Sequence, residues 1–230
     1  MIRRQVPEEM DRPDVDSRDH VHALRSLNRI NGLFGVNRRL GRRVQGFCPC
    51  LSVLDLGCGG GGFLAGLSAM PNQRRPALLI GLDRSAFALE CAGRWHPHDL
   101  RWVAADARCI PLADNSVDVV TSSLFLHHFG TTDAVDLLRE AARVARRGVV
   151  IGDLARSWPA WALTGLVTRV LTRSRLVHVD GPRSVRAAFE AAELAGLADQ
   201  AGLEGAWVER QFPFRLILTW KKLELRIDPR

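Results

Sequence analysis

The sequence Val-Leu-Asp-Leu-Gly-Cys-Gly-Gly-Gly-Gly spans residues 53–62 and is the most informative part of the chain for its fold. A compact apolar run ends here in a stretch of five glycines and one cysteine. The apolar run predicts a buried strand, and the glycines predict a turn where missing side chains let a ligand approach the backbone closely. Residues 63–70 then follow a helical pattern, so strand, glycine turn and helix come in direct succession.

The same alternation continues along the chain after this turn. The predicted strands are continuous apolar runs and not alternating stripes, which indicates a parallel sheet covered by helices on both faces. The fold class is therefore α/β, a doubly wound, mostly parallel, Rossmann-like sheet of seven strands. Predicted strands are 51–56, 77–82, 100–105, 117–122 and 148–152, and the helices between them are 63–70, 85–93 and 134–145.

The C-terminal part breaks this alternation. Residues 206–210 and 214–222 both follow a helix predicted at 190–201 without a helix between them, which indicates an antiparallel hairpin at the edge of the sheet. Residues 154–183 form an insertion before that last helix.

The N-terminal part precedes the α/β pattern. Residues 19–43 show two short helical patterns separated by glycines, and residues 1–19 predict a loosely held arm. The expected organisation is an arm with lid helices over 1–45, followed by one domain over 46–230.

Composition restricts the class of protein. The net charge of +7 comes from arginines scattered along 230 residues, which disfavours nucleic acid as a partner. Five cysteines, an odd number, favour a reducing compartment, the cytoplasm. The chain has no signal peptide pattern and no run of roughly 20 apolar residues, so we expect a soluble protein.

The glycines alone leave two cofactor classes open. Gly57, Gly59 and Gly62 satisfy the spacing G-x-G-x-x-G, which is typical of NAD(P)-dependent oxidoreductases. Asp55 argues against that class, because a nucleotide fingerprint ordinarily has an apolar residue at its position. Asp83 and Asp106 close the next two predicted strands at the same edge, where open α/β sheets bind ligands.

These segments resemble the motifs of class I S-adenosylmethionine-dependent methyltransferases, strongly over residues 53–152. The resemblance implies that Asp55 supports the loop and reaches toward the amino group of the methionine part. It implies that Asp83 accepts hydrogen bonds from the ribose hydroxyls and that Asp106 bonds the adenine amino group. The further cofactor-binding residues that it implies are Gly57, Cys58, Gly59, Gly61, Arg84, the backbone of Ala107, Ser122 and Ser123. Asp118 is interpreted as structural.

Methyl transfer from a sulfonium needs alignment and no covalent intermediate. A hydroxyl acceptor also needs a base, and His127 and His128 directly follow the fourth predicted strand, beside the expected methyl position. We expect one of the two to point inward and to be structural. No metal cluster is expected, because Cys48 and Cys50 have no second pair at zinc spacing.

The insertion should select the acceptor, a small molecule. Residues 158–175 combine tryptophans and aliphatic side chains with several arginines, so they predict a hydrophobic lid, a helix packed on the domain, or a peripheral membrane contact. We expect O-methylation of a phenolic, polyketide-like or quinone-like acceptor by a monomer or homodimer. The alternatives are C-methylation of the same acceptor class, NAD(P)-dependent oxidoreduction, and a non-catalytic domain.

Overall fold

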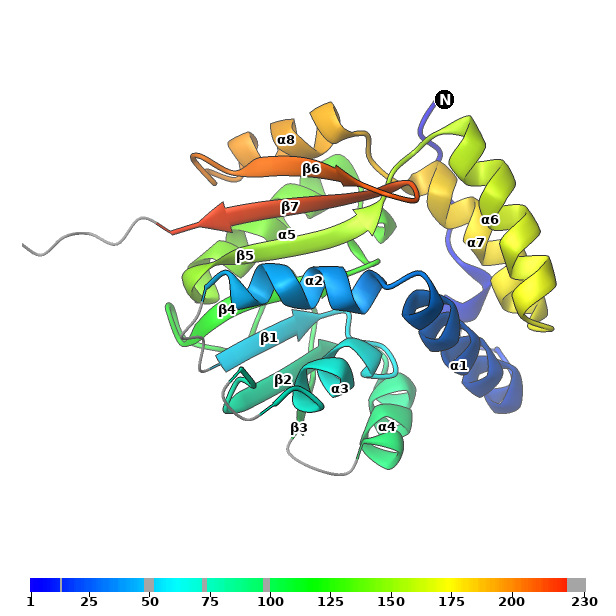
Figure 1. Cartoon of the computed structure of the whole chain (residues 1–230), viewed down its shortest axis with the longest axis horizontal. Helices are drawn as coiled ribbons and strands as arrows, with labels where there is room; N and C mark the ends of the chain where they lie inside the picture. The colour runs from blue at the N-terminus through cyan, green and yellow to red at the C-terminus, as the bar shows by residue number, and fades with distance from the viewer. Residues whose placement is uncertain (13, 48–51, 72–73, 97–99, 223–230) are drawn as a thin grey trace, which may run out of the picture.

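A seven-stranded sheet with helices on both faces forms the centre of the molecule (Figure 1). The computed structural model describes residues 1–12, 14–47, 52–71, 74–96 and 100–222. The strand order is β3-β2-β1-β4-β5-β7-β6, with β1 to β5 parallel and β7 antiparallel to both of its neighbours. The predicted doubly wound fold and C-terminal hairpin are confirmed, and β6 is the edge strand of that hairpin.

The strands and helices keep the predicted order. The strands are β1 (Ser52–Leu56), β2 (Leu78–Asp83), β3 (Leu100–Ala104), β4 (Val117–Ser123), β5 (Ala145–Leu154), β6 (Trp207–Gln211) and β7 (Arg215–Lys221). The helices are α1 (Ser17–Leu33), α2 (Val36–Gln45), α3 (Gly62–Ser68), α4 (Ala86–Trp95), α5 (Thr131–Val144), α6 (Trp158–Leu171), α7 (Arg175–Ala187) and α8 (Ala191–Gln200), with 3-10 turns at Glu9–Asp11 and Leu126–His128.

Burial on both faces explains why the central strands read as continuous apolar runs. Every residue of β1 is buried. On one face, Leu138 of α5 and Leu197 of α8 belong to the largest core cluster, and on the other face Leu40 of α2 and Leu64 of α3 belong to a second cluster. A strand between two such layers has no solvent-facing side, so period-two alternation is lost.

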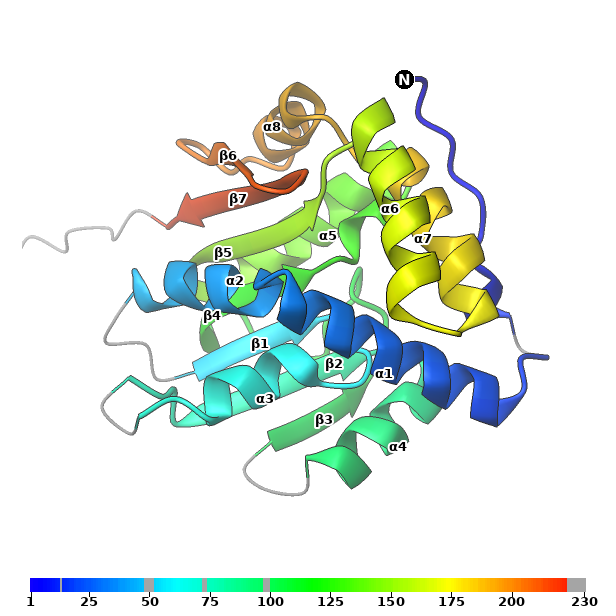
Figure 2. The ribbon, with the colours of Figure 1, turned by 45° about the vertical axis from the view of Figure 1, so that its right-hand side comes forward.

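The insertion folds as a hairpin of two helices, α6 and α7, and not as a single helix. The Asp-Gly-Pro sequence at 180–182 lies inside α7. Helix α1 packs on α7 through a small cluster that contains Ala23, Ile30 and Val177. All three helices gather at the carboxyl ends of the parallel strands, the edge at which ligands bind in open α/β sheets (Figures 1 and 2).

The N-terminal arm is held against the body, which corrects the expectation of a loose arm. We call residues 1–12 the N-terminal strap. The Arg4 N–H donates to the Arg186 carbonyl (3.0 Å), and the Arg3 guanidinium donates to the carbonyls of Ala187 (2.6 Å) and Phe129 (2.7 Å). Local sequence did not reveal this docking because its partners are backbone carbonyls more than 120 residues away.

Arg156 is the buried residue that joins the strap to the rest of the fold. Its side chain is 5% exposed, and it donates to the Met1 carbonyl (2.8 Å), to the Ala188 carbonyl (2.9 Å) and to Glu193 (2.7 and 2.9 Å). One guanidinium thus connects the strap, the end of α7 and the start of α8.

We predict that Arg156→Ala lowers the free energy of unfolding by about 2 kcal/mol, because the carbonyls and carboxylates around it lose a charged donor. Urea denaturation measures the change. Arg139→Ala, an exposed arginine of α5, is the matched control and should stay within about 0.5 kcal/mol of the parent chain. Equal stability of the two variants would contradict the role assigned to Arg156.

Candidate functional site

The candidate site lies where β1, β2, β3 and β4 end side by side. Their adjacency in the sheet places Asp55, Asp83 and Ser122 along one edge, since Asp55 pairs with Gly81 and Leu56 pairs with Ser122. Residues that are far apart in sequence therefore line one continuous edge.

The glycine turn between β1 and α3 has a backbone conformation that residues with a side chain rarely adopt. Gly57, Gly59 and Gly61 have φ of 66°, 50° and 73°, in the left-handed region that glycine adopts without steric cost. The Gly57 and Cys58 N–H groups both donate to the Leu82 carbonyl (2.8 and 3.1 Å). The turn is thereby fastened to β2, the strand that carries Asp83.

Neighbouring side chains lie directly on this turn. A Cβ at Gly57 would overlap the ring of Phe125, and a Cβ at Gly61 would lie 2.5 Å from the Trp102 ring. A Cβ at Gly62 would lie 2.6 Å from the amide oxygen of Asn28 on α1. The glycines are thus required by packing as well as by φ, and residues from three distant segments close around the turn.

Asp83 is the residue that ties the turn to the end of β2. One carboxylate oxygen accepts the Gly59 N–H (2.8 Å) and the other accepts the Ser85 N–H (2.8 Å). Burial raises its pKa, and these two hydrogen bonds oppose the shift. The side chain is only partly buried, so lone pairs remain for hydroxyl groups of a ligand, as the resemblance implies for ribose.

Asp55 lies beneath the turn and not at its surface. It is 2% exposed and accepts a hydrogen bond from the Thr121 hydroxyl (3.0 Å). Burial raises its pKa to about 8, with a contribution from the charge of Asp83 and against the bond from Thr121. This placement fits the expected support of the loop; in the present conformation the carboxyl has little surface to offer an ammonium group.

Asp106 lies at the mouth of the site on the loop after β3. Its carboxylate is paired with the Arg108 guanidinium (2.8 Å), which lowers its pKa to about 2. An adenine amino group at this carboxylate would share it with Arg108. Ala107 is buried, while Arg84 directly after β2 is exposed.

The remaining predicted cofactor residues are close to the turn but differ in access. Ser122 is fully buried and donates to the Leu56 carbonyl (3.1 Å), whereas Ser123 is partly exposed. Cys58 is buried, and burial raises the pKa of its thiol well above the ordinary value. A protonated, buried thiol is a poor nucleophile, so Cys58 is not suited to covalent catalysis.

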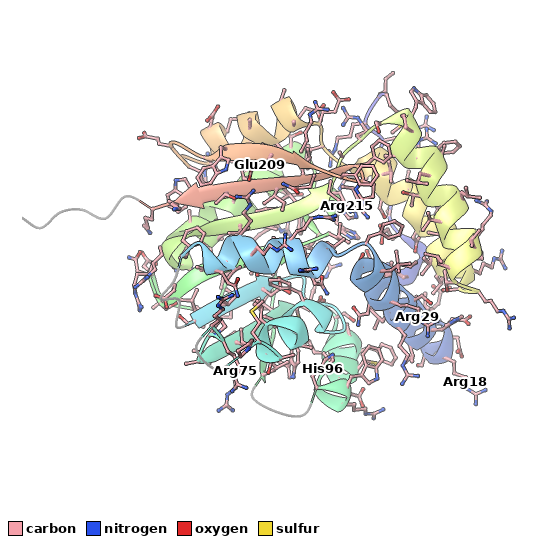
Figure 3. All side chains as sticks on the ribbon, viewed as in Figure 1. Arg18, Arg29, Arg75, His96, Glu209 and Arg215 are labelled. Carbon is pink, nitrogen blue, oxygen red and sulfur yellow. The ribbon has the colours of Figure 1, made fainter. Side chains whose placement is uncertain are left out.

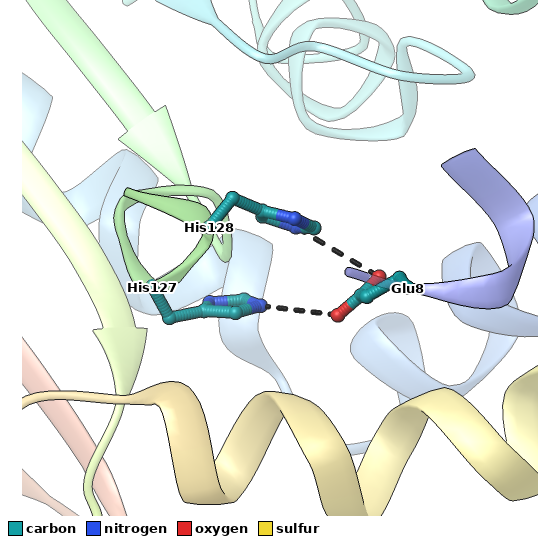
Figure 4. A group of neighbouring side chains, drawn as sticks. All are labelled: Glu8, His127 and His128. Carbon is teal, nitrogen blue, oxygen red and sulfur yellow. Dashed lines mark ion pairs between the residues drawn. The ribbon is translucent and has the colours of Figure 1, made fainter. Parts of the chain in front are cut away.

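His127 and His128 face a third residue, Glu8 of the N-terminal strap (Figure 4). Glu8 lies 3.5 Å from the His127 Nε2 and 3.8 Å from the His128 Nε2, and it accepts the Ser184 hydroxyl through a short hydrogen bond. The two imidazoles stack with ring centroids 4.5 Å apart. The strap thus brings a carboxylate to the histidines that directly follow β4.

His127 is the inward-pointing member of the pair, as expected for one of the two. It is 3% exposed, and its Nδ1 lies 2.7 Å from the Asp153 carboxylate at the end of β5. Burial alone would lower its pKa, but the charge and hydrogen bond of Asp153, together with Glu8, outweigh it and raise the pKa to about 10. The two carboxylates on either side of His127 thus favour its imidazolium form.

His128 keeps access to the site. Its side chain is 25% exposed, and its Nδ1 lies 3.5 Å from Asp11, a second carboxylate of the strap. Among the described residues, Glu8, His127 and His128 are the one group whose ligand atoms, all within 4.8 Å, match a metal donor set. Cys48 and Cys50 lie outside the described residues.

Sequence reasoning missed Glu8, Asp11, Asp153 and Asn28. A run of two acids and a methionine after Pro7 gives no signal of a site, because its partners are defined only by docking of the strap. His96 also lies beside Gly61 at the turn, and its Nε2 is buried without a partner among the described residues (Figure 3).

The comparisons with known proteins match the segment of the chain that carries this site. Residues 54–151 match a family described as "Methyltransferase domain". This segment contains the glycine turn, the three aspartates and both histidines. Over residues 54–151 the chain is therefore similar to methyltransferase domains.

Curated relatives align with about half of the chain. The demethylmenaquinone methyltransferase of Roseiflexus sp. (strain RS-1) is 36% identical over 113 residues, 48% of this chain and 44% of that protein. The biotin biosynthesis bifunctional protein BioHC of Cellvibrio japonicus is 33% identical over 118 residues, 50% of this chain and 22% of that protein. The aligned part therefore spans less than half of either relative.

Solved structures extend the likeness of fold to most of the chain. The plantazolicin methyltransferase BpumL, in complex with a desmethylPZN analog and SAH, has a TM-score of 0.64 at 16% identity over 90% of this chain and 95% of that one. A SAM-dependent methyltransferase from Aquifex aeolicus has a TM-score of 0.53 at 19% identity over 75% of this chain and 82% of that one.

We predict that Gly57→Ala lowers the free energy of unfolding by about 1–3 kcal/mol, because it combines a left-handed φ with overlap on Phe125. Gly196→Ala is the matched control. Gly196 lies inside α8, and a Cβ added there would have no heavy atom within 4 Å, so alanine should stabilise the helix by about 0.5–1 kcal/mol. Thermal or urea unfolding of both variants should give opposite signs.

We predict that the His127 ring titrates near pH 10 in an NMR titration of its ring protons, and that Asp153→Asn lowers that pKa. Because the folded pKa is raised above that of the unfolded chain, the stability contributed by His127 is fully present below about pH 6.5 and is lost as pH rises through about 10. His127→Gln should therefore show a flatter loss of stability over that range. A ring pKa near 6.5 in the folded protein would contradict the two-carboxylate environment.

Proposed function

We propose that the protein transfers a methyl group from S-adenosylmethionine to a hydroxyl of a hydrophobic or aromatic small molecule, with His128 as the general base. The observation that carries this proposal is one sheet edge with a glycine turn fastened by Asp83 at one side and His128 at the other. S-adenosylmethionine supplies an activated methyl on a positively charged sulfonium when it is bound.

The backbone of the glycine turn and the carboxylates of nearby aspartates would hold the cofactor. Asp83 has free acceptor capacity beside Gly59, and Asp106 lies at the mouth of the site. Carboxylates around the site, including Asp11 of the strap, match the positive charges of the cofactor. Orientation of this kind can contribute about 7–11 kcal/mol to a bimolecular transfer, so no covalent residue is required.

The proton of the acceptor hydroxyl would go to the imidazole of His128. Glu8 at 3.8 Å and Asp11 at 3.5 Å would stabilise the imidazolium that forms. His127 is less suited to this role, because the carboxylates of Asp153 and Glu8 raise its pKa and favour the protonated ring. We assign His127 the task of positioning Glu8 and the stacked ring of His128.

The acceptor class rests on the apolar insertion and on the relatives. Four relatives carry demethylmenaquinone in their names and one carries malonyl-[acyl-carrier protein], so a quinone and an acyl oxygen are both candidate acceptor groups. A phenolic, polyketide-like or quinone-like acceptor best fits a protein whose insertion carries an exposed apolar face. C-methylation of such a ring is the second candidate, and product analysis separates it from O-methylation.

We predict that Asp83→Ala weakens binding of S-adenosylhomocysteine at least about tenfold in calorimetry, since it removes a charged hydrogen-bond acceptor and the fastening of Gly59. Asp199→Ala, an exposed acid of α8, is the control and should bind as the parent does. Binding of NADP instead of S-adenosylhomocysteine by the parent chain would favour an oxidoreductase and contradict the proposal.

We predict that His128→Ala lowers kcat by about 10²- to 10⁴-fold with cofactor affinity unchanged. The acceptor can be identified by mass spectrometry of metabolites from cells with and without the gene, because its product is heavier by one methylene. His128→Ala with full kcat toward that acceptor would remove His128 from the mechanism. His22→Ala, an exposed histidine of α1, is the control that should leave kcat unchanged.

A further inference from the structure

Helix α6 buries small side chains and exposes several of its large apolar ones, the reverse of a helix packed on a domain. Of its 14 residues only Ala160 and Thr168 are buried. Trp158, Leu166 and Val170 are 64%, 61% and 71% exposed. Large apolar side chains are ordinarily the most buried, so this face has no covering partner in the described chain.

Packing against α7 explains the inverted pattern. Gly165 lies against the Pro182 ring, and Gly181 of α7 lies against the side chains of Thr164 and Thr168. Small residues on both helices let them approach closely, and the wide side chains are left on the opposite face. Trp158, Leu166 and Val170 follow each other at spacings of eight and four residues, which places them on one broad stripe of the helix. We call this stripe the α6 apolar face.

A cluster of arginines continues the α6 apolar face toward α1. Val170 also lines a surface cavity of about 530 Å³ between α1 and the end of α6, where the Ser26 and Thr172 hydroxyls meet at 2.7 Å. No acidic residue lines this cavity, and no carboxylate of the described chain lies within 4.0 Å of its arginines. These arginines are Arg25 and Arg29 of α1, Arg169 of α6, and Arg173, which follows the end of α6. Figure 3 labels Arg29.

We propose that the α6 apolar face and these four arginines form a peripheral docking surface for a membrane that contains anionic lipids. Tryptophan and aliphatic side chains on one stripe, bordered by arginines, are the composition of helices that lie in the headgroup region. The arginines supply the charge complementarity to phosphate headgroups. None of the helices in the described part of the chain has the length and hydropathy of a membrane span. Such a surface would place the site of an enzyme for hydrophobic acceptors next to the phase that dissolves them.

The test is co-sedimentation of the full chain with phosphatidylcholine vesicles, with and without phosphatidylglycerol. We expect binding to the anionic vesicles, weaker binding to phosphatidylcholine alone, and release by high salt. Trp158 and Trp161 emission should shift to the blue on binding, a shift that Trp158→Phe combined with Trp161→Phe removes.

Two variants separate the two parts of the surface. Leu166→Gln with Val170→Gln should reduce vesicle binding about tenfold without changing net charge. Arg169→Gln with Arg173→Gln should reduce binding to anionic vesicles about fivefold per arginine. Arg101→Gln with Arg139→Gln removes the same charge from exposed positions on β3 and α5 and should bind as the parent does.

All variants should bind S-adenosylhomocysteine with parental affinity, which keeps failure of this proposal separate from failure of the proposed methyl transfer. Absence of vesicle binding by the parent chain would overturn the proposal. An equal loss of vesicle binding in the Arg101→Gln, Arg139→Gln control would also overturn it. The same holds if the parent chain binds no vesicles but is captured through its arginines by an immobilised acidic carrier protein.

Discussion

The chain of contacts from Asp153 through His127 to Glu8 holds the candidate site together. Asp153 ends β5, His127 follows β4, and Glu8 belongs to the N-terminal strap. A buried imidazolium between two carboxylates is stable only while both remain in place, because loss of either leaves uncompensated charge away from water. This single side chain therefore couples the sheet edge to the strap that covers it.

Two kinds of contact, one made by the backbone and one made by side chains, hold the two sides of the site. The proposed cofactor side depends on backbone: Gly57, Gly59 and Gly61 adopt left-handed φ, and Asp83 accepts the Gly59 N–H. The proposed acceptor side depends on side chains that the strap delivers, Glu8 and Asp11 beside His128. Backbone geometry suits a part of the site shared by a whole family, whereas side chains on an appended segment can differ between acceptors without disturbing the sheet.

The outward α6 apolar face and the proposed acceptor class are consistent with each other, because both involve a hydrophobic phase. An enzyme whose acceptor is hydrophobic gains little from a site far from the lipid phase. Helices α1, α6 and α7 stand at the carboxyl edge of the sheet, so the surface that we assign to a membrane and the site that we assign to methyl transfer are on the same end of the molecule (Figure 2). The first property can be measured with vesicles, the second with cofactor and acceptor.

The order of strands and helices, the glycine turn and the carboxylates at the strand ends could all be predicted from residue patterns, because they follow from local apolar periodicity and backbone requirements. The same patterns predicted that one of His127 and His128 would point inward. Which of the two does so, and that Glu8, Asp11 and Asp153 surround them, became visible only in the folded chain. Glu8 lies 119 residues before His127, and no local pattern encodes a contact that exists only after the strap docks on α7. The direction of α6 was undecided for the same reason: a helix with apolar residues all round has no preferred buried face until Gly165 and Gly181 set how closely α7 approaches.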